Sequence, residues 1–380
     1  MISSLMLVNF KCFRSLKLDL GPINVLAGMN GAGKSTIIQS LLAVRQSGET
    51  GSLQKHRIDL NGTLVELGTS GEVFCADPDG SSIEISINSV TAAGQKRELR
   101  LVCPQSEQNS LDYFLSFKLP LSGGSASIPE SVLFAEPFNY LHAERVGARK
   151  VFDISPNTRD PSTVGKSGEN APYIIGSEQR ELPVKNSAVI LESADGKEYP
   201  TIRFQWALWM ASLFPGFEGE SEIYLRADQI RLEMALQRQA TGKNLFVRPT
   251  NTGFGLSYAL GIIVAGLVAQ PGTMLIVENP EAHLHPRAQS MLGEFLARVS
   301  AGGTQVIVET HSEHVVNGIR RMVKEDIVRP DNVKLFFFAR ETHMLEPRVT
   351  PITVTDSADI SAWPDGFFDQ LDKDLSTILT

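Results

Sequence analysis

The sequence INVLAGMNGAGKST, from Ile23 to Thr36, decides the fold of this chain. Its apolar beginning has the character of a short strand, and its second part, Gly28 to Ser35, satisfies the pattern GxxxxGK(S/T). A helical pattern from Thr36 to Val44 follows directly. Glycines in such a turn let successive N–H groups point at phosphate oxygens, and the start of the helix adds a favourable partial charge. The stretch therefore predicts a strand, a phosphate-binding turn and a helix of an α/β fold.

This turn also predicts which residues bind ATP and Mg²⁺. Lys34 should reach the β and γ phosphates, and the Ser35 hydroxyl should ligate Mg²⁺. A glycine turn with a purely structural role is the alternative. The expected ATP-binding residues are Asn30, Gly31, Ala32, Gly33, Lys34, Ser35 and Thr36.

Composition narrows the class of protein. The chain has 380 residues, of which 42% are hydrophobic, and this is enough for a sizeable core. Its net charge of −8 argues against a generally basic nucleic-acid binder, but a local basic surface remains compatible with it. Three scattered cysteines suggest neither a disulfide framework nor a zinc site. The longest apolar stretch, Leu256 to Ala269, is too short for a bilayer. We therefore expect no membrane anchor and a cytoplasmic location.

The periodicity along the chain predicts an α/β fold with a mainly parallel central sheet, an antiparallel β subdomain and a helical lobe. Strands alternate with helices in the last third, which is typical of a parallel sheet covered on both faces. β-branched alternation broken by turn dipeptides indicates the antiparallel subdomain between Asp59 and Leu119. The helices predicted in the second half of the chain are Thr201 to Leu213, Ala227 to Gln239, Gly255 to Ala269, Pro286 to Val299 and Glu313 to Val323.

We interpret the whole chain, 1–380, as a single nucleotide-binding domain. Its expected segments are 1–150 with the phosphate-binding turn and β subdomain, 151–200 as a loop-rich insertion, 201–270 as a helical lobe, 271–340 as the acidic core and 341–380 as a tail.

The run LIVENPEAHLHP, Leu275 to Pro286, predicts the second part of the site. Its apolar start reads as a buried strand, and Glu278 is the first acid at the carboxyl end, where ligands gather in open α/β sheets. Phosphoryl transfer needs a carboxylate for the metal's water shell and a polar group for the attacking water. We therefore expect Glu278 to share Mg²⁺ with Ser35. The next predicted strand leads to His311, which we expect at the γ phosphate, with a structural histidine as the alternative.

These segments resemble a known family. ENPEAHLHP, followed by VIVETHSEHVVNGIRR, is similar to the Walker B and switch-histidine segments of ABC-type ATPases of the SMC, Rad50 and RecF branch. The resemblance is strongest to small bacterial AAA ATPases related to the OLD-family head. YLHAER, Tyr140 to Arg145, resembles the Y-x-x-AER segment of that set, and WPDGFF, at 363–368, resembles an uncharacterised tail. The resemblance implies the fold of an ABC-type head.

Such heads close over ATP with a signature segment from the opposite subunit, and two segments are candidates. Leu121 to Ser125 looks like the transporter sequence LSGGQ but lies far upstream, whereas Asn251 to Ser257 opens the apolar helix before Met274. The resemblance implies that Ser257 and Gly255 approach the γ phosphate of a neighbour's ATP, with a glycine-rich helix cap as the alternative. Two chains would then sandwich two ATP molecules, and hydrolysis would release the dimer.

The catalytic residues are expected to be Lys34, His311, Glu278 and Glu281. In the family, the catalytic glutamate directly follows the metal-associated acid, whereas this chain has Asn279 at that place. An amide cannot accept a proton, although it can orient water. Either Glu278 and Glu281 share the metal and base roles, or the protein stays long in an ATP-closed state. We expect slow but real turnover, since phosphoryl transfer rests mainly on positioning and electrostatics.

Other polar residues have less specific interpretations. Glu144 and Arg145 could act like the family's Q-loop, which senses nucleotide, or form a surface ion pair. His283 and His285 suggest a metal pair by spacing, but we expect them in a loop rather than as ligands.

The expected function is an ATPase switch that regulates a separately encoded effector, such as a nuclease, in DNA maintenance or anti-phage defence. The rival is a DNA-binding ATPase that acts alone, and a transporter subunit is a weaker alternative. The rival would use a basic surface from Arg145, Arg149, Lys150, Arg320, Arg321 and Lys324, which could equally be a solvated face.

Overall fold

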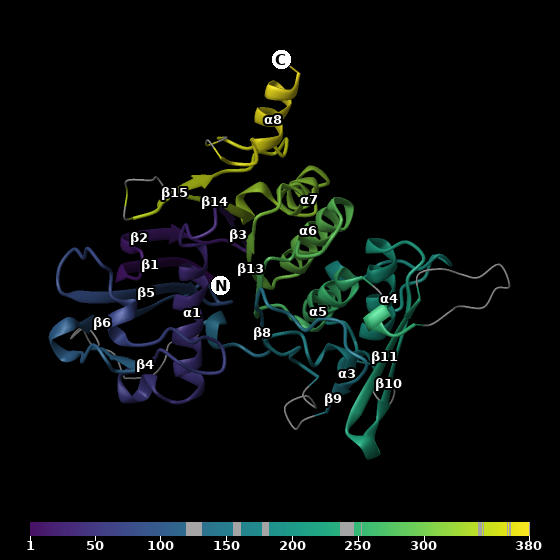
Figure 1. The fold of residues 1–380 in the computed structure, drawn as a ribbon, viewed down its shortest axis with the longest axis horizontal. Coiled ribbons are helices and arrows are strands. Elements are labelled where there is room, and N and C mark those ends of the chain that lie inside the picture. Colours follow the sequence, from purple (N-terminus) through teal and green to yellow (C-terminus); the bar gives the residue numbers. More distant parts are fainter. Residues whose placement is uncertain are drawn as a thin grey trace. The chain divides into compact units, whose positions relative to one another are not determined.

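The computed structural model describes residues 1–118, 131–154, 161–176, 182–235, 247–251, 253–340, 344, 346–362, 364 and 366–379. These residues form two compact units, which are described separately below (Figure 1). Unit 1 comprises Met1–Ala135, Asp331–Thr353 and Ile360–Thr380, and unit 2 comprises Glu136–Pro330 and Val354–Asp359. The segment boundaries expected from the sequence stay predictions.

Unit 1 contains the antiparallel β subdomain that the sequence predicts. The strand order is β2 (Phe13–Asp19), β1 (Ile2–Phe10), β5 (Ser82–Val90) and β6 (Lys96–Pro104). Alternate residues of β6 are buried, as a sheet with one face on the core requires. A second pair, β4 (Arg57–Asp59) and β7 (Phe114–Ser116), lies in the same unit.

The phosphate-binding turn of unit 1 stands between a buried strand and a long helix. β3 (Ile23–Gly28) pairs in parallel with β14 (Val333–Ala339), and β15 (Arg348–Ile352) pairs with β14 in the antiparallel direction. The first five residues of β3 are all buried, which is typical of a strand covered on both faces. The helix α1 (Lys34–Glu49) follows the turn.

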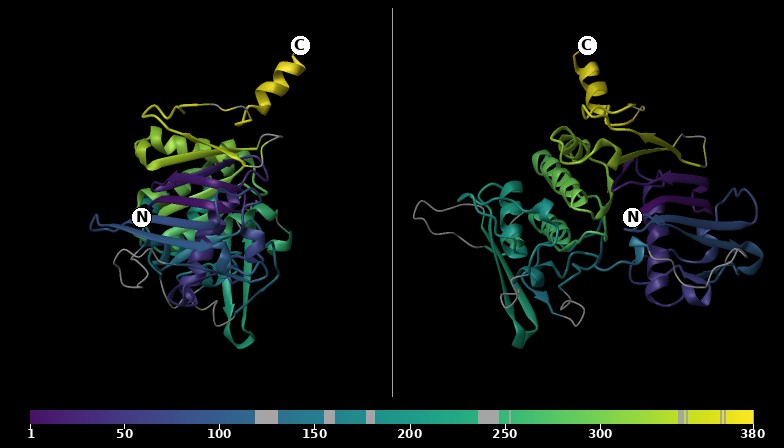
Figure 2. Two further views of the ribbon diagram at one scale, coloured as in Figure 1. Left: turned by 90° about the vertical axis from the view of Figure 1, so that its left-hand side faces the viewer. Right: turned by 180° about the vertical axis from the view of Figure 1, so that it is seen from behind.

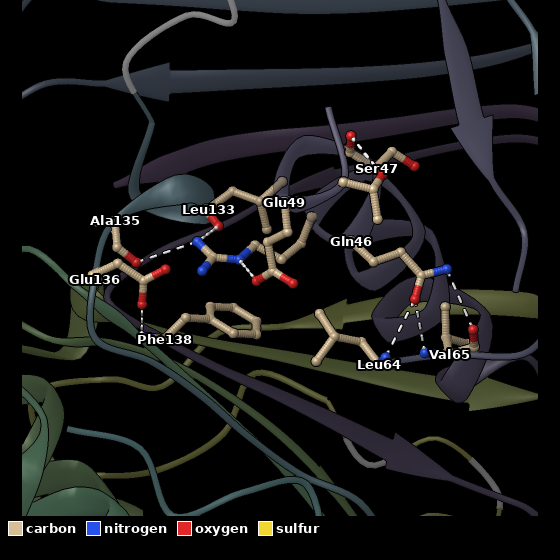
Figure 3. A network of polar contacts seen from close by, with 11 residues as sticks. Gln46, Ser47, Glu49, Leu64, Val65, Leu133, Ala135, Glu136 and Phe138 are labelled. Carbon is tan, nitrogen blue, oxygen red and sulfur yellow. Dashed lines mark hydrogen bonds and ion pairs between the residues drawn. The ribbon is translucent and has the colours of Figure 1, made fainter. Parts of the chain in front are cut away.

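Polar side chains at the far end of α1 tie it to the rest of unit 1 (Figure 3). The amide group of Gln46 accepts from the backbone of Val65, at 3.1 Å, and donates to the carbonyl of Asp59, at 2.9 Å. The buried Arg45 donates to the carbonyls of Leu133, at 2.9 Å, and Ala135, at 3.3 Å. Because all of these side chains stand on one helix, they fix α1, and with it the turn at its start, within the unit.

Unit 2 holds the acidic strand ends. β8 (Phe138–Leu141), β12 (Met274–Glu278) and β13 (Gln305–Thr310) pair in parallel, with β12 in the middle. Three helices follow or precede these strands: α5 (Phe254–Val268), α6 (Pro286–Ala301) and α7 (Glu313–Lys324). The carboxyl ends of the three strands therefore lie at the same edge of the sheet.

The helical lobe of unit 2 differs from the sequence prediction at one element. α4 (Ile202–Leu213) is present as expected, but Gln229–Ala235, within the predicted helix Ala227 to Gln239, is the strand β11. It pairs with β10 (Glu218–Tyr224) in a long hairpin (Figure 2). The sequence QIRLEMA buries alternate residues, and this period of two belongs to a strand although Leu, Glu, Met and Ala favour helices.

The remaining elements are short. They are the helices α2 (Ser70–Val73), α3 (Ala171–Gly176) and α8 (Gln370–Ile378), the strand β9 (Phe152–Asp153), and 3₁₀ turns at Leu53–Lys55, Gln105–Glu107, Val132–Phe134, Ser187–Val189, Leu225–Ala227, Pro249–Asn251 and Pro330–Asn332. In the described part of the chain, no helix is both long and apolar enough to cross a membrane.

Candidate functional site

The turn between β3 and α1 has the backbone of a phosphate cradle. Gly28, Gly31 and Gly33 have φ angles of 139°, 72° and 88°, which residues other than glycine rarely adopt. A Cβ at Gly28 would lie 2.1 Å from the carbonyl oxygen of Phe338, and one at Gly33 would lie 2.8 Å from the Cys12 sulfur. A Cβ at Gly31 would meet nothing within 4 Å. The glycines thus satisfy close packing on the inner side of the turn and leave its outer side open.

The polar residues of the turn suit a bound polyphosphate. The Lys34 Nζ donates to the carbonyls of Gly28, at 3.0 Å, and Met29, at 2.7 Å, and this side chain is only 3% exposed. Its ammonium group is therefore held against the turn itself. Asn30 and Gly31 are exposed, Ser35 and Gly33 are half-buried, and Ala32 and Thr36 are buried. The lysine and the start of a helix of 16 residues together make an environment that attracts anions.

In unit 2, the carboxylate of Glu278 is held by the end of β8. Tyr140 Oη donates to Glu278 Oε1 at 3.0 Å, and the backbone N–H of Ala143 donates to Oε2 at 3.3 Å. The Nε2 atom of His142 lies 3.9 Å from the same Oε2. Burial, followed by the charge of Glu278, raises the pKa of Tyr140 well above its ordinary value, so the phenol stays a donor at neutral pH. Glu278 is itself buried, at the end of β12.

A different strand holds Glu281. Its carboxylate accepts from the Thr310 hydroxyl at 2.7 Å and from the backbone N–H of His311 at 2.6 Å. His311 is exposed at the end of β13. Glu278 therefore ends β12 and is tied to β8, whereas Glu281 lies in the turn after β12 and is tied to the end of β13. This arrangement brings Glu278, Glu281 and His311, three of the predicted catalytic residues, to one edge of unit 2.

Asn279 occupies a special backbone position between the two acids. Its φ is 45°, in the left-handed region that asparagine tolerates better than most residues. Its N–H donates to the carbonyl of Glu309 at 2.8 Å, and among the described residues its buried Oδ1 has no hydrogen-bond partner. The amide that the sequence singled out is thus part of the turn that presents Glu281.

Arg145 does not form the surface ion pair considered from the sequence. It is 4% exposed and donates to the carbonyls of Glu278, at 2.6 Å, and Asn279, at 2.5 Å. Sequence reasoning missed the roles of Tyr140 and Arg145 as contacts of the acidic strand end. The YLHAER segment drew attention to these residues, but their contacts depend on the β8–β12 register, in which Tyr140 is the partner of Ile276.

The predicted signature segment begins α5. A Cβ at Gly255 would lie 2.5 Å from the carbonyl oxygen of His283, so this helix end packs closely on the turn after Glu281. Ser257 is 9% exposed, and its buried hydroxyl has no hydrogen-bond partner among the described residues. Gly253 and Phe254 are the exposed residues of the first turn. The role of Ser257 and Gly255 toward a neighbouring chain stays a prediction, and the rival segment at 121–125 lies outside the described residues.

The two histidines of the HLH sequence have structural contacts. The His285 Nδ1 accepts from the backbone N–H of Arg287 at 3.3 Å and caps α6. The His283 ring lies 4.9 Å from the Tyr258 ring and 5.7 Å from the Phe254 ring, measured between centroids. Across the described ranges, no three His, Cys, Asp or Glu residues form a group suited to a metal ion.

Three families of known proteins match parts of the chain. Residues 4–119 match a family described as "AAA domain", and residues 217–317 match one described as "AAA domain, putative AbiEii toxin, Type IV TA system". Residues 328–378 match a family described as "Protein of unknown function (DUF3696)". The two AAA matches contain the phosphate cradle and the acidic strand ends.

One curated relative and two solved structures extend this likeness. An OLD nuclease of Thermus scotoductus is 24% identical over an alignment of 366 positions that covers 90% of this chain and 65% of that protein. The SMC head bound to the C-terminal winged-helix domain of ScpA matches with a TM-score of 0.55 and 13% identity over 94% of this chain and 98% of that one. An SMC head from Pyrococcus furiosus, with an extended coiled coil and bound to the C-terminal domain of ScpA, matches with a TM-score of 0.50 and 13% identity over 100% and 99%. The chain thus has a fold similar to that of SMC heads, and parts of it match AAA-domain families.

Proposed function

We propose that this protein is an ATP-binding and slowly hydrolysing switch. The observation that carries the proposal is the cradle of unit 1, where left-handed glycines and the buried Lys34 meet the start of α1. These groups have the charge and the donor geometry that a polyphosphate requires. The AAA-domain matches in the first and second halves of the chain support the same activity.

The roles of the individual residues follow from their chemistry. Ser35 and Glu278 would hold Mg²⁺, which neutralises phosphate charge when bound. Glu281 would accept the proton of the attacking water, and His311 would donate to the γ phosphate. Asn279 offers no base beside Glu278, and we infer that turnover is slow for this reason. Each of these roles is part of the proposal.

We further propose that two chains close head to tail over two ATP molecules and regulate a separate effector. Gly255 and Ser257 would face the partner chain's nucleotide. The similar SMC heads are bound to another protein, ScpA, and the curated relative is called a nuclease. These names support a protein partner, such as a nuclease, in DNA maintenance or anti-phage defence.

We also propose a cytoplasmic location, because the three free cysteines suit a reducing compartment.

Phosphate release from Mg-ATP tests the proposal. The parent chain should release phosphate slowly, and Lys34→Ala should abolish release because the β and γ phosphates lose their cation. Lys55→Ala, an exposed lysine of the same unit, should leave the rate unchanged. If the parent neither binds ATP nor releases phosphate, the ATPase function is refuted.

Three arginines of the basic surface that the DNA-binding alternative requires make contacts within the chain. Arg145 is buried against backbone carbonyls, and Arg321 pairs with Glu294. Arg320 donates to the carbonyl of Ala358 at 2.8 Å. Hydrolysis that rises with duplex DNA and loses this stimulation as salt increases would favour the rival, whereas hydrolysis indifferent to DNA favours the effector switch.

A further inference from the structure

The buried guanidinium of Arg145 lies against the turn that carries the acids of unit 2. Nη1 donates to the carbonyl of Glu278 at 2.6 Å and to that of His142 at 3.2 Å, and Nη2 donates to the carbonyl of Asn279 at 2.5 Å. Burial lowers the pKa of Arg145 to about 10, which leaves it charged at neutral pH. Among the described residues, its Nε–H has no hydrogen-bond partner. These three hydrogen bonds of the buried guanidinium all go to carbonyls, and a buried charge is weak support for stability, which points to a role beyond stability.

Two of the three carbonyls that accept from Arg145, those of Glu278 and Asn279, belong to successive residues of a strained turn. Asn279 has a φ of 45°, and its N–H is held from the other side by the carbonyl of Glu309, at 2.8 Å. The peptide between Glu278 and Asn279 is therefore fixed at both its N–H and its C=O. Because Glu278 precedes this peptide and Glu281 follows it by two residues, its orientation determines where both carboxylates point.

Arg145 also contacts the first turns of α5. Its guanidinium carbon lies 5.2 Å from the centroid of the Tyr258 ring, within the range of a cation–π interaction. The Tyr258 ring in turn packs edge-on against His283, whose φ is 62° and which ends the acidic turn. One side chain thus joins the end of β8, the turn after β12 and the start of α5.

We propose that Arg145 is a positioning residue for ATP hydrolysis: it fixes the backbone of Glu278 and Asn279, orients Glu278 and Glu281, and links their position to that of α5. The inference rests on the proposed ATPase function and assigns the YLHAER segment a task within it. Arginine suits this task because its planar group offers several donors in a fixed fork, whereas a lysine ammonium cannot hold two carbonyls and stack on a ring in the same way.

The substitution Arg145→Lys tests the proposal because it keeps the charge and removes the fork. Arg298→Lys is the matched control, an arginine of the same unit that pairs with Glu294 at 3.1 Å away from the turn. We expect Arg145→Lys to lower kcat about 10- to 100-fold, as loss of supporting contacts to catalytic groups usually does. KM for ATP should stay the same, because the phosphate cradle belongs to unit 1. Hydrogen exchange of the peptide 278–284 should become faster without nucleotide, and the control should match the parent in all three measurements.

The outcomes separate the inference from the proposed function. If Arg145→Lys folds and retains the parent's kcat, or if exchange at 278–284 does not change, the inference is overturned. A parallel loss of kcat, ATP binding and thermal stability would show a structural role only and would also overturn it. If Arg145→Lys does not fold, Tyr258→Leu removes the ring beneath the guanidinium and should lower kcat with KM unchanged; an unaltered kcat then refutes the inference. A parent without ATPase activity would instead refute the proposed function itself.

Discussion

Glu281 is held at both carboxylate oxygens by the end of β13, and this fixes its direction better than that of an ordinary loop acid. Thr310 Oγ1 and the N–H of His311 are its donors, at 2.7 and 2.6 Å. If Glu281 is the general base, Glu281→Gln should lower kcat about 100-fold or more while ATP binding stays intact, because an amide cannot accept the proton. Phosphate release at saturating Mg-ATP and nucleotide binding, measured on the same preparation, check this.

Glu325→Gln is the control for this substitution, since Glu325 is an exposed acid beyond the end of α7 in the same unit. It should turn over like the parent. Unchanged turnover in Glu281→Gln would remove Glu281 from the chemistry and leave Glu278 as the remaining acid of this turn.

At the level of elements, a comparison of two glycines separates the cost of backbone strain from the cost of side-chain crowding in the turn between β3 and α1. Gly33 has a φ of 88°, and a Cβ there would meet the Cys12 sulfur and the Phe13 ring at 2.8 Å; Gly80 has a φ of 93°, and a Cβ there would meet nothing within 4 Å. Both alanine variants bear a left-handed cost of about 1–2 kcal/mol. Gly33→Ala should lose about 1–3 kcal/mol more through overpacking, together with ATP binding.

Denaturant unfolding and nucleotide binding check this pair of variants. The expected result is a larger drop in the unfolding midpoint for Gly33→Ala than for Gly80→Ala, with ATP binding lost only in Gly33→Ala. Equal midpoints would mean that Cys12 and Phe13 move aside without cost, and the close packing of the cradle would then not explain its glycine.

The β5–β6 pair predicts a pH dependence of stability. Arg100 donates to both carboxylate oxygens of Glu84, at 2.9 Å each, and this lowers the pKa of Glu84. A carboxyl whose pKa is lower in the folded state stabilises the folded protein at pH values above its unfolded pKa of about 4.3. This stabilisation is lost as the pH falls through the folded-state pKa. Arg100→Gln should therefore lower the thermal midpoint slightly at pH 7, and its difference from the parent should shrink as the pH falls below the unfolded pKa of about 4.3. The effect is small because the Arg100 side chain is 47% exposed.

Thermal scans of parent and Arg100→Gln from pH 7 to pH 3.5 measure this difference. Arg97→Gln, on the same strand and exposed, is the control. A difference between parent and Arg100→Gln that grows as the pH falls would contradict the sign of the pKa shift.

The sequence predicts elements well where pattern and burial agree. β3, β12 and β13 are mainly apolar runs followed by polar turns, and the structure has a strand at each of these places, as the sequence predicts. Ala227 to Gln239 was predicted wrongly because good helix formers carry a strand's alternation there. The contacts of Arg145 could not be predicted, since they depend on the register of β8 beside β12, which no local pattern encodes.

For the whole molecule, closure of two chains over ATP is the central prediction, and the structure suggests a sharper probe than Ser257. That residue is 9% exposed, so a large substituent there would disturb the monomer. Gly253 is exposed at the start of α5, and a Cβ there meets nothing within 4 Å. Gly253→Glu should therefore fold normally, while its negative charge repels the γ phosphate of a neighbouring chain's ATP.

Sedimentation with a non-hydrolysable ATP analogue and Mg²⁺ tests this prediction. The parent and Gly253→Ala should shift from monomer to dimer when the analogue saturates the cradle, whereas Gly253→Glu should bind the analogue and stay monomeric. Raising the salt concentration should restore part of its dimerisation if the block is electrostatic, because an exposed charge is screened over about 10 Å at 0.1 M salt. A Gly253→Glu chain that dimerises like the parent would place the start of α5 away from the partner's nucleotide, and a parent that stays monomeric when saturated would exclude the two-chain clamp altogether.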